Sequence, residues 1–327
     1  ESKLKTPVVG ITANRPPPLS APSRGATWTP PPPLPDGLVV ERRLVARLRA
    51  LHAEGLILGA QLSLVDVYSA APIADVVVGH TSWLAPHDVT RETPFPLQEI
   101  SRIFLALSVL RASDSISESA PPLLDAVVGG ATVEQVLGYT SGHVVHLPRY
   151  VGSLNDMCDA KAMAAAAAAD APTLTPGTAQ RYLHVPFGYL LDASLRARGS
   201  SAALAWASMA EAALGPGGAS RLMLSAPTTR TAEPWKTLRA SSVEDFATIM
   251  IEFNRYLNIA QASEAPGATE AERANFASYA CLFGKVSWLE ASGIRDGGVQ
   301  AAELHGLQAF ATARDTSLAL AAAARGE

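Results

Sequence analysis

Apolar and polar positions first fall into a clear pattern at Leu38. In LVVERRLVARLRALHAEG, residues 38–55, apolar side chains recur at helical spacing and Gly55 ends the run. The arginines occupy intervening positions, so we predict an amphipathic helix with a basic outer face. Two segments rich in β-branched residues follow, GAQLSLVDVYS at 59–69 and IADVVVGHTS at 73–82. The short turn between them, residues 70–72, predicts an antiparallel hairpin.

The middle of the chain has the pattern of a helical region. Segment 101–113 is apolar on almost every side, and Thr132 with Gln135 stands in the places of a capping box for a helix at 132–139. We predict further helices at 182–199, 201–214 and 243–261. The final segments, 285–291, 302–314 and 316–324, are predicted to be two or three strands that return to the first hairpin. This order predicts an α+β fold, with an antiparallel sheet built from both chain ends and flanked by helices.

Residues 16–35, PPPLSAPSRGATWTPPPPLP, cannot form an ordinary helix or a central strand. Proline lacks the N–H and fixes φ, so we expect extended polyproline II. The segment is predicted to be a linker, or a strap that Trp28 anchors to a surface. We therefore divide the chain into a proline-rich segment, 1–37, and a folded domain, 38–327. Because the chain begins with Glu1, we also expect a processed product or part of a longer polypeptide.

Composition and charge exclude several classes of protein. The net charge of -4 gives no electrostatic footprint for nucleic acid. Cys158 and Cys281 are too few for a disulfide framework, so a reducing compartment is compatible, including that of an organelle such as a mitochondrion or chloroplast. Apolar runs fall short of the length of a membrane span. Only 17% of residues are charged, and the resulting neutral surfaces favour contacts with protein partners.

Four segments resemble, in order, motifs of the serine β-lactamase, DD-peptidase and class C esterase superfamily. TPFPLQEISRIFLAL (93–107) resembles the segment that carries Ser-x-x-Lys, and VEQVLGYTSGHV (133–144) resembles the "LLTHTSG" segment. TPGTAQRYLHVPFGYLLDASLRARG (175–199) resembles the stretch with Pro-Gly, Tyr-x-Asn and a helix. AELHGLQAFATARDTSLALA (302–321) resembles the closing strands, where a His-x-Gly or Lys-Thr-Gly element lines the site. The resemblance covers about residues 38 to 325 and implies a β-lactamase-like domain.

The resemblance also implies that the catalytic motifs are degenerate. Glu99 stands at the position of the nucleophilic serine and Arg102 at that of the lysine base; Tyr182 keeps the tyrosine, and His184 replaces the asparagine. Arginine, with a pKa above about 12, cannot accept the proton of a nucleophile. A glutamate nucleophile would give a high-energy anhydride on acyl transfer. His305 is the matching position in the last motif.

Two interpretations of these positions follow. Glu99 and Arg102, three residues apart, can form a structural ion pair that closes the old site. Alternatively, Glu99 is a general base or a ligand-binding carboxylate, with Tyr182 and His184 or His305 nearby.

Other candidate motifs are weaker. His143 and His146 could offer two metal ligands but lack a third at supporting spacing. Ser141 in GYTSGH is one place late for a nucleophile elbow, and the glycines at 215–218 are followed by no lysine. Tyr256 and Asn258 match Tyr-x-Asn without the preceding Pro-Gly. We expect no cofactor and no metal.

We predict a non-catalytic β-lactamase-like domain that serves as a scaffold or interaction subunit of a larger protein or complex. By resemblance, a kinase-like domain in the same chain is one expected partner, because relatives of this superfamily occur fused to UbiB-type kinase-like domains. The alternative is a hydrolase or ligand-binding protein with a reassigned site.

Overall fold

The computed structural model describes residues 37–81, 87–115, 122–143, 155–225 and 302–326. Within these residues every strand pair is antiparallel, and helices pack around the short sheets. The predicted α+β class is confirmed. The proline-rich segment, the predicted helix at 243–261 and the predicted strand at 285–291 lie outside the described residues.

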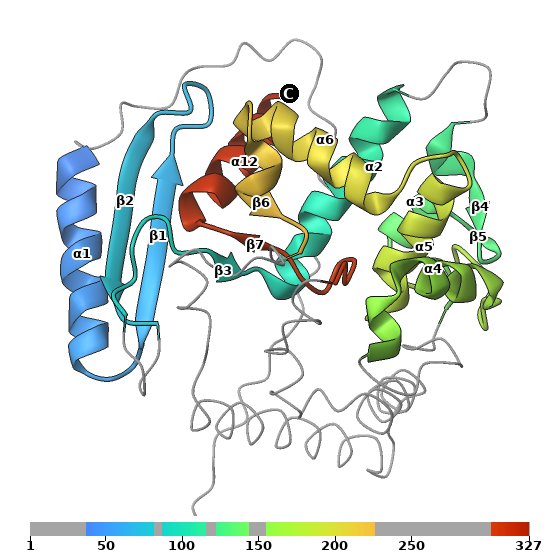
Figure 1. The fold of residues 1–327 in the computed structure, drawn as a ribbon, viewed down its shortest axis with the longest axis horizontal. Helices are drawn as coiled ribbons and strands as arrows, with labels where there is room; N and C mark the ends of the chain where they lie inside the picture. The colour runs from blue at the N-terminus through green and yellow to red at the C-terminus, as the bar shows by residue number, and fades with distance from the viewer. Residues whose placement is uncertain (1–36, 82–86, 116–121, 144–154, 226–301, 327) are drawn as a thin grey trace, which may run out of the picture. The chain divides into compact units, whose positions relative to one another are not determined.

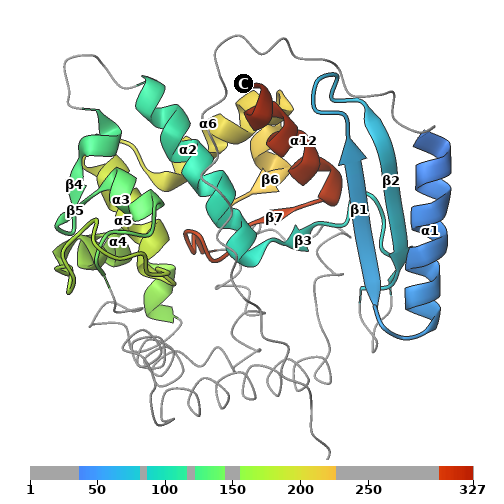
Figure 2. The ribbon, with the colours of Figure 1, turned by 180° about the vertical axis from the view of Figure 1, so that it is seen from behind.

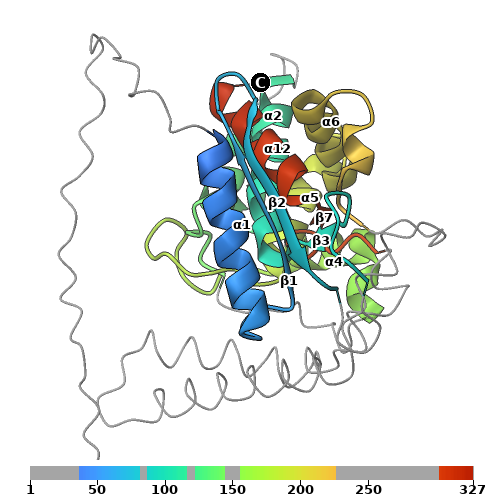
Figure 3. The same ribbon diagram turned by 90° about the vertical axis from the view of Figure 1, so that its left-hand side faces the viewer.

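The hairpin predicted near the start of the domain is present and carries a helix on each strand. β1 (Gly59–Val65) pairs with β2 (Pro72–Gly79), with Gly59 opposite Gly79. Alternate residues of β2, Ala74, Val76 and Val78, are buried, as a half-buried strand requires. Helix α1 (Gly37–Ala53) packs along β2, and the last helix, α12 (Ala313–Arg325), packs along β1 (Figures 1 and 3).

The remaining helices build the core of the domain. α2 (Ser101–Ser115) packs on α6 (Ala202–Leu214), and α4 (Ala160–Ala169) packs on α5 (Pro186–Arg196). Figures 1 and 2 show α2 between α6 and α12 on one side and α3 (Val133–Leu137), α4 and α5 on the other. The fully buried side chains of this core include Phe104, Leu105, Met163, Tyr189, Leu190 and Leu191. Burial of this apolar surface is the main stabilising contribution to the fold.

Two short sheets join distant parts of the chain. β3 (Phe95–Pro96), β7 (Phe310–Ala311) and β6 (Leu222–Met223) pair in the order β3-β7-β6. β4 (Val127–Val128) pairs with β5 (Ala131–Thr132). Short 3-10 turns lie at Gln98–Ile100, Leu123–Asp125, Asn155–Cys158 and Gly218–Ser220. The 3-10 turn at Gln98–Ile100 directly precedes α2, so β3 and β7 fix the start of that helix.

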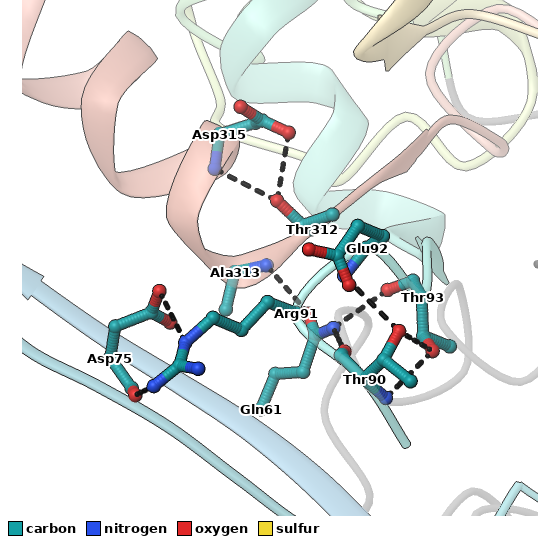
Figure 4. A network of polar contacts seen from close by, with 9 residues as sticks. All are labelled: Gln61, Asp75, Thr90, Arg91, Glu92, Thr93, Thr312, Ala313 and Asp315. Atoms are coloured by element: carbon teal, nitrogen blue, oxygen red, sulfur yellow. Dashed lines mark hydrogen bonds and ion pairs between the residues drawn. The ribbon is translucent and has the colours of Figure 1, made fainter. Parts of the chain in front are cut away.

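Gln61 connects three segments through its side-chain amide (Figure 4). Its Nε2 donates to the carbonyls of Thr90 (2.5 Å) and Thr93 (2.8 Å), and its Oε1 accepts from the backbone N–H of Ala313 (2.9 Å). The first N–H groups of a helix have no partner within the helix, so Gln61 caps α12 from the neighbouring strand. The N-terminal hairpin is thereby attached to the C-terminal helix.

Two strand predictions are wrong in this region. Of residues 302–314, only Phe310–Ala311 form a strand. Residues 316–324, predicted to be a strand, form most of α12. Alanine has the highest helix propensity, and the Thr312 side chain accepts a hydrogen bond from the Asp315 N–H at the helix start. Both signals outweigh the apolar run that suggested a strand. The predicted helix at 201–214 and the capping box of Thr132 and Gln135 are confirmed.

Candidate functional site

Arg102, the residue at the position of the family's lysine, is buried in the first turn of α2, with 5% of its surface exposed. Its guanidinium donates to three backbone carbonyls from two distant segments. Nε donates to Gly306 (3.0 Å), Nη1 to Leu183 (2.5 Å) and Nη2 to His184. Three charge-assisted hydrogen bonds of this kind hold the guanidinium in one orientation. Arg102 thus joins α2 to the segment before α5 and to the loop before β7.

Aromatic rings pack around the same guanidinium. Tyr139 lies between Tyr182 and Phe187 in a stack, with ring centroids 5.3 Å and 5.1 Å apart. The Arg102 Cζ atom lies 4.5 Å from the Tyr182 centroid and 5.3 Å from that of Phe187. A cation above aromatic rings is attracted by their negative faces. The rings and the carbonyls together occupy the surroundings of Arg102.

Glu99, the residue at the position of the family's serine, lies in the 3-10 turn before α2, and 47% of its side chain is exposed. Its Oε1 lies 3.0 Å from the Nε2 of His184. The Nη2 of Arg102 is 3.8 Å from the same oxygen. The predicted pair of Glu99 and Arg102 therefore exists, but it is the longer of the two contacts.

Tyr182 adds a phenol to this cluster. Burial raises the pKa of Tyr182, the positive charge of Arg102 opposes that rise, and a hydrogen bond to the Glu99 carboxylate raises the pKa further. The phenol therefore stays protonated at neutral pH and donates to Glu99. A protonated, hydrogen-bonded tyrosine cannot accept a proton from a nucleophile. The structure brings together Glu99, Arg102, Tyr182 and His184 as the motif alignment predicts.

His305 belongs to a different environment from the one proposed for it. Its side chain is fully buried, and its Nε2 lies 3.3 Å from Oδ2 of Asp192. Asp192 also accepts hydrogen bonds from the Ala202 N–H (2.7 Å) and from Arg196 (2.6 Å). Burial alone would raise the pKa of Asp192, but the neighbouring His305 and the hydrogen bonds from Ala202 and Arg196 hold it below the ordinary value. His305 thus contributes to a buried polar network that joins the C-terminal segment to α5 and α6.

In the motif of His143 and His146, His143 has a structural role. His143 is buried, its Nδ1 is 3.0 Å from the Ser141 hydroxyl, and its Nε2 is 3.1 Å from the Asp170 carbonyl. Both ring nitrogens therefore have protein partners. His146, Tyr256 and Asn258 lie outside the described residues. No group of three or more metal-ligating side chains occurs among the described ranges, and none of their helices is long and apolar enough to span a membrane.

Sequence reasoning missed two residues of these clusters. Tyr139 has a φ of 57°, a left-handed conformation unusual for a non-glycine residue, and it places its ring between Tyr182 and Phe187. No sequence signal indicates this geometry. Asp192, in contrast, precedes Arg196 by four residues on a helix, a spacing that predicts an ion pair.

Comparisons with known proteins agree on the fold. No family model matches the sequence, and no curated protein matches it. Among solved structures, the chain is similar to a family VIII carboxylesterase (TM-score 0.58, 18% identity, 85% of this chain and 67% of that one). It is also similar to EstA from Arthrobacter nitroguajacolicus Rue61a (TM-score 0.51, 18% identity, 83% and 65%). A class C β-lactamase aligns with a TM-score of 0.44 at 19% identity, over 62% of this chain and 55% of that one.

The chain spans about two thirds of the length of the first two structures. At 18% identity these likenesses describe the backbone arrangement and not the chemistry. The chain therefore shares its backbone fold with the family VIII carboxylesterase and with EstA.

Proposed function

We propose that this protein is a non-catalytic β-lactamase-like domain that acts as a scaffold or interaction subunit of a larger protein or complex. The observation that carries the proposal is the state of Arg102. Its guanidinium is committed to three backbone carbonyls and stays protonated. A base is required to activate a nucleophile at this position, and arginine cannot be that base.

The Glu99 carboxylate supports the same proposal. Its side chain contacts His184 and Arg102 and accepts a hydrogen bond from Tyr182. A carboxylate with these three neighbours is a poor nucleophile, and an acyl-glutamate would be an anhydride. The interaction role follows the expectation from the sequence, and the expected kinase-like partner in the same chain stays part of this proposal.

The test is covalent labelling combined with turnover. The family VIII carboxylesterase likeness makes short-chain nitrophenyl esters the substrates to try, and a fluorophosphonate and a β-lactam are the labels. We expect no mass increase and no turnover above the uncatalysed rate for the wild type. The double variant Glu99→Ser/Arg102→Lys controls for access of the reagents. A stoichiometric adduct on the wild type, or turnover that Glu99→Ala abolishes, contradicts the proposal.

A second candidate function rests on one specific distance. The 3.0 Å contact between Glu99 and His184 is the geometry of a carboxylate that orients an imidazole, and such a pair can act as a general base towards water. In that case hydrolysis occurs without a covalent adduct. It requires ester turnover that falls at least about a hundredfold in both Glu99→Gln and His184→Asn, the lower end of the range for loss of a general base.

A further inference from the structure

The outer face of α1 carries four arginines. Arg42, Arg43, Arg47 and Arg49 are exposed, whereas Leu44, Leu48 and Leu51 are half-buried on the side that packs along β2. In the described residues no ion pair or hydrogen bond joins any of the four to another side chain. The chain as a whole has a net charge of -4. The outer face of α1 is therefore a concentrated and unneutralised basic surface on an acidic protein.

The side chains between these arginines are small. Val39, Ala46 and Ala53 are exposed, and Ala50 is half-buried. With Arg43 they follow the alternating spacing of four and three residues that marks the seam of a helix pair. Arg42, Arg47 and Arg49 flank this seam at the positions that, in paired helices, select a partner by charge. We name this surface, formed by Val39, Arg42, Arg43, Ala46, Arg47, Arg49, Ala50 and Ala53, the α1 outer face.

We propose that the α1 outer face binds an amphipathic helix of a protein partner that carries glutamate or aspartate beside its apolar seam. Small seam residues let a second helix approach to the short end of the usual range of about 8–10 Å between axes. The flanking arginines then reach the partner's carboxylates, so charge complementarity fixes which helices bind. The inference builds on the interaction role proposed above and places it on α1, which lies on the other side of the β1–β2 hairpin from α2 (Figure 1).

Other occupants fit this surface less well. A membrane-surface helix buries a broad apolar face in the lipid, but the large apolar side chains of α1 are turned towards β2, and Val39 is the only large apolar side chain among the exposed α1 residues that the structure describes. Nucleic acid favours proteins whose overall charge is positive, which this chain does not have. A strip of small residues between charged rows matches the shape of a helix.

The proposal is tested with designed peptides on the full chain. The probe is a helical peptide of about three heptads with leucine at the seam and glutamate at the flanking positions, and its counterpart carries lysine at those positions. We expect the glutamate peptide to bind and the lysine peptide not to bind. Binding should weaken at least about tenfold in Arg42→Glu/Arg49→Glu, while Arg111→Glu, an exposed arginine of α2, leaves it unchanged. The arginine-reversed variant should instead prefer the lysine peptide.

A further variant separates a helix partner from a general polyanion. Ala46→Gln keeps every charge but obstructs the seam, so it should weaken binding of the glutamate peptide and leave any weak binding to phosphatidylserine vesicles or duplex DNA unchanged. The proposal is overturned if both peptides bind equally, if Ala46→Gln has no effect on the peptide, or if vesicles or DNA bind more tightly than the glutamate peptide. These measurements do not involve hydrolysis. A negative peptide result would therefore overturn this inference without affecting the proposal that the domain is non-catalytic.

Discussion

Replacement of Arg102 tests what the guanidinium stabilises in the native protein. Arg102→Met keeps most of the side-chain volume and removes the donors to Gly306, Leu183 and His184. A buried acceptor left without a partner costs about 1–3 kcal/mol. Three such carbonyls predict a loss of about 3–5 kcal/mol in the free energy of unfolding, since relaxation and water recover part of the total. That loss is a large part of the about 5–15 kcal/mol by which a typical domain is stable.

Glu99 should behave differently although it contacts the same guanidinium. Its carboxylate is half exposed and 3.8 Å from Arg102, and exposed ion pairs contribute about 0–1 kcal/mol. Glu99→Gln should therefore change the free energy of unfolding by less than about 1 kcal/mol. The double variant Glu99→Gln/Arg102→Met should be as unstable as Arg102→Met alone, because the orphaned carbonyls are the same in both.

Denaturation in urea, followed by circular dichroism, measures these differences as shifts in midpoint at constant slope. Arg111→Met, an exposed change on the same helix, is the matched control and should be close to wild type. A double variant that regains most of the stability lost in Arg102→Met would mean that the Glu99–Arg102 ion pair determines the cost. Such a recovery would refute the assignment of that cost to the three orphaned carbonyls.

Three other changes have defined outcomes. Gln61→Leu removes three hydrogen bonds to backbone groups and should lower the free energy of unfolding by about 2–3 kcal/mol; an unchanged urea midpoint would contradict this. Gly188→Ala places a Cβ 2.0 Å from the His305 carbonyl oxygen and should cost about 3 kcal/mol or more, whereas Gly138→Ala, with no atom nearer than 3.4 Å, should cost less than about 1 kcal/mol. The native pKa of Asp192 is depressed, so its contribution to stability is present above the unfolded value of about 4 and is lost as the pH falls through the native value. The stability difference between wild type and Asp192→Asn should therefore shrink below about pH 4, and a constant difference would exclude this linkage.

The elements predicted correctly are those whose signals are local. Thr132 and Gln135 form the capping box expected of them, and the β-branched runs on either side of residues 66–71 form the hairpin. The strand prediction for 316–324 is wrong because it followed the apolar run and passed over the local helix signals. Thr312 followed three residues later by Asp315, ahead of an alanine-rich run, is a helix start that the sequence already contains.

The sequence predicted which residues lie together at the site, but not which hydrogen bonds they form. The order of the motifs alone predicted that Glu99, Arg102, Tyr182 and His184 lie close together, because that order was compared with a β-lactamase-like fold. The acceptors of Arg102 are backbone carbonyls, which have no residue identity and therefore leave no trace in a sequence. His305 matched a motif position, yet its imidazole packs against Asp192 and Tyr189. A motif fixes where the backbone runs and not which neighbour a side chain meets.

The carbonyl contacts of Arg102 also determine when the domain can finish folding during its synthesis. Arg102 and Gly306 are 204 residues apart, and Gln61 and Ala313 are 252 apart. At about 5–20 residues per second, a ribosome needs about 10–40 s to extend the chain from Arg102 to its acceptor at Gly306. Through that interval a cation and the apolar face of α2 lack part of their native surroundings, and contacts at such separation also form slowly. The domain therefore completes its fold only after α12 has emerged from the ribosome.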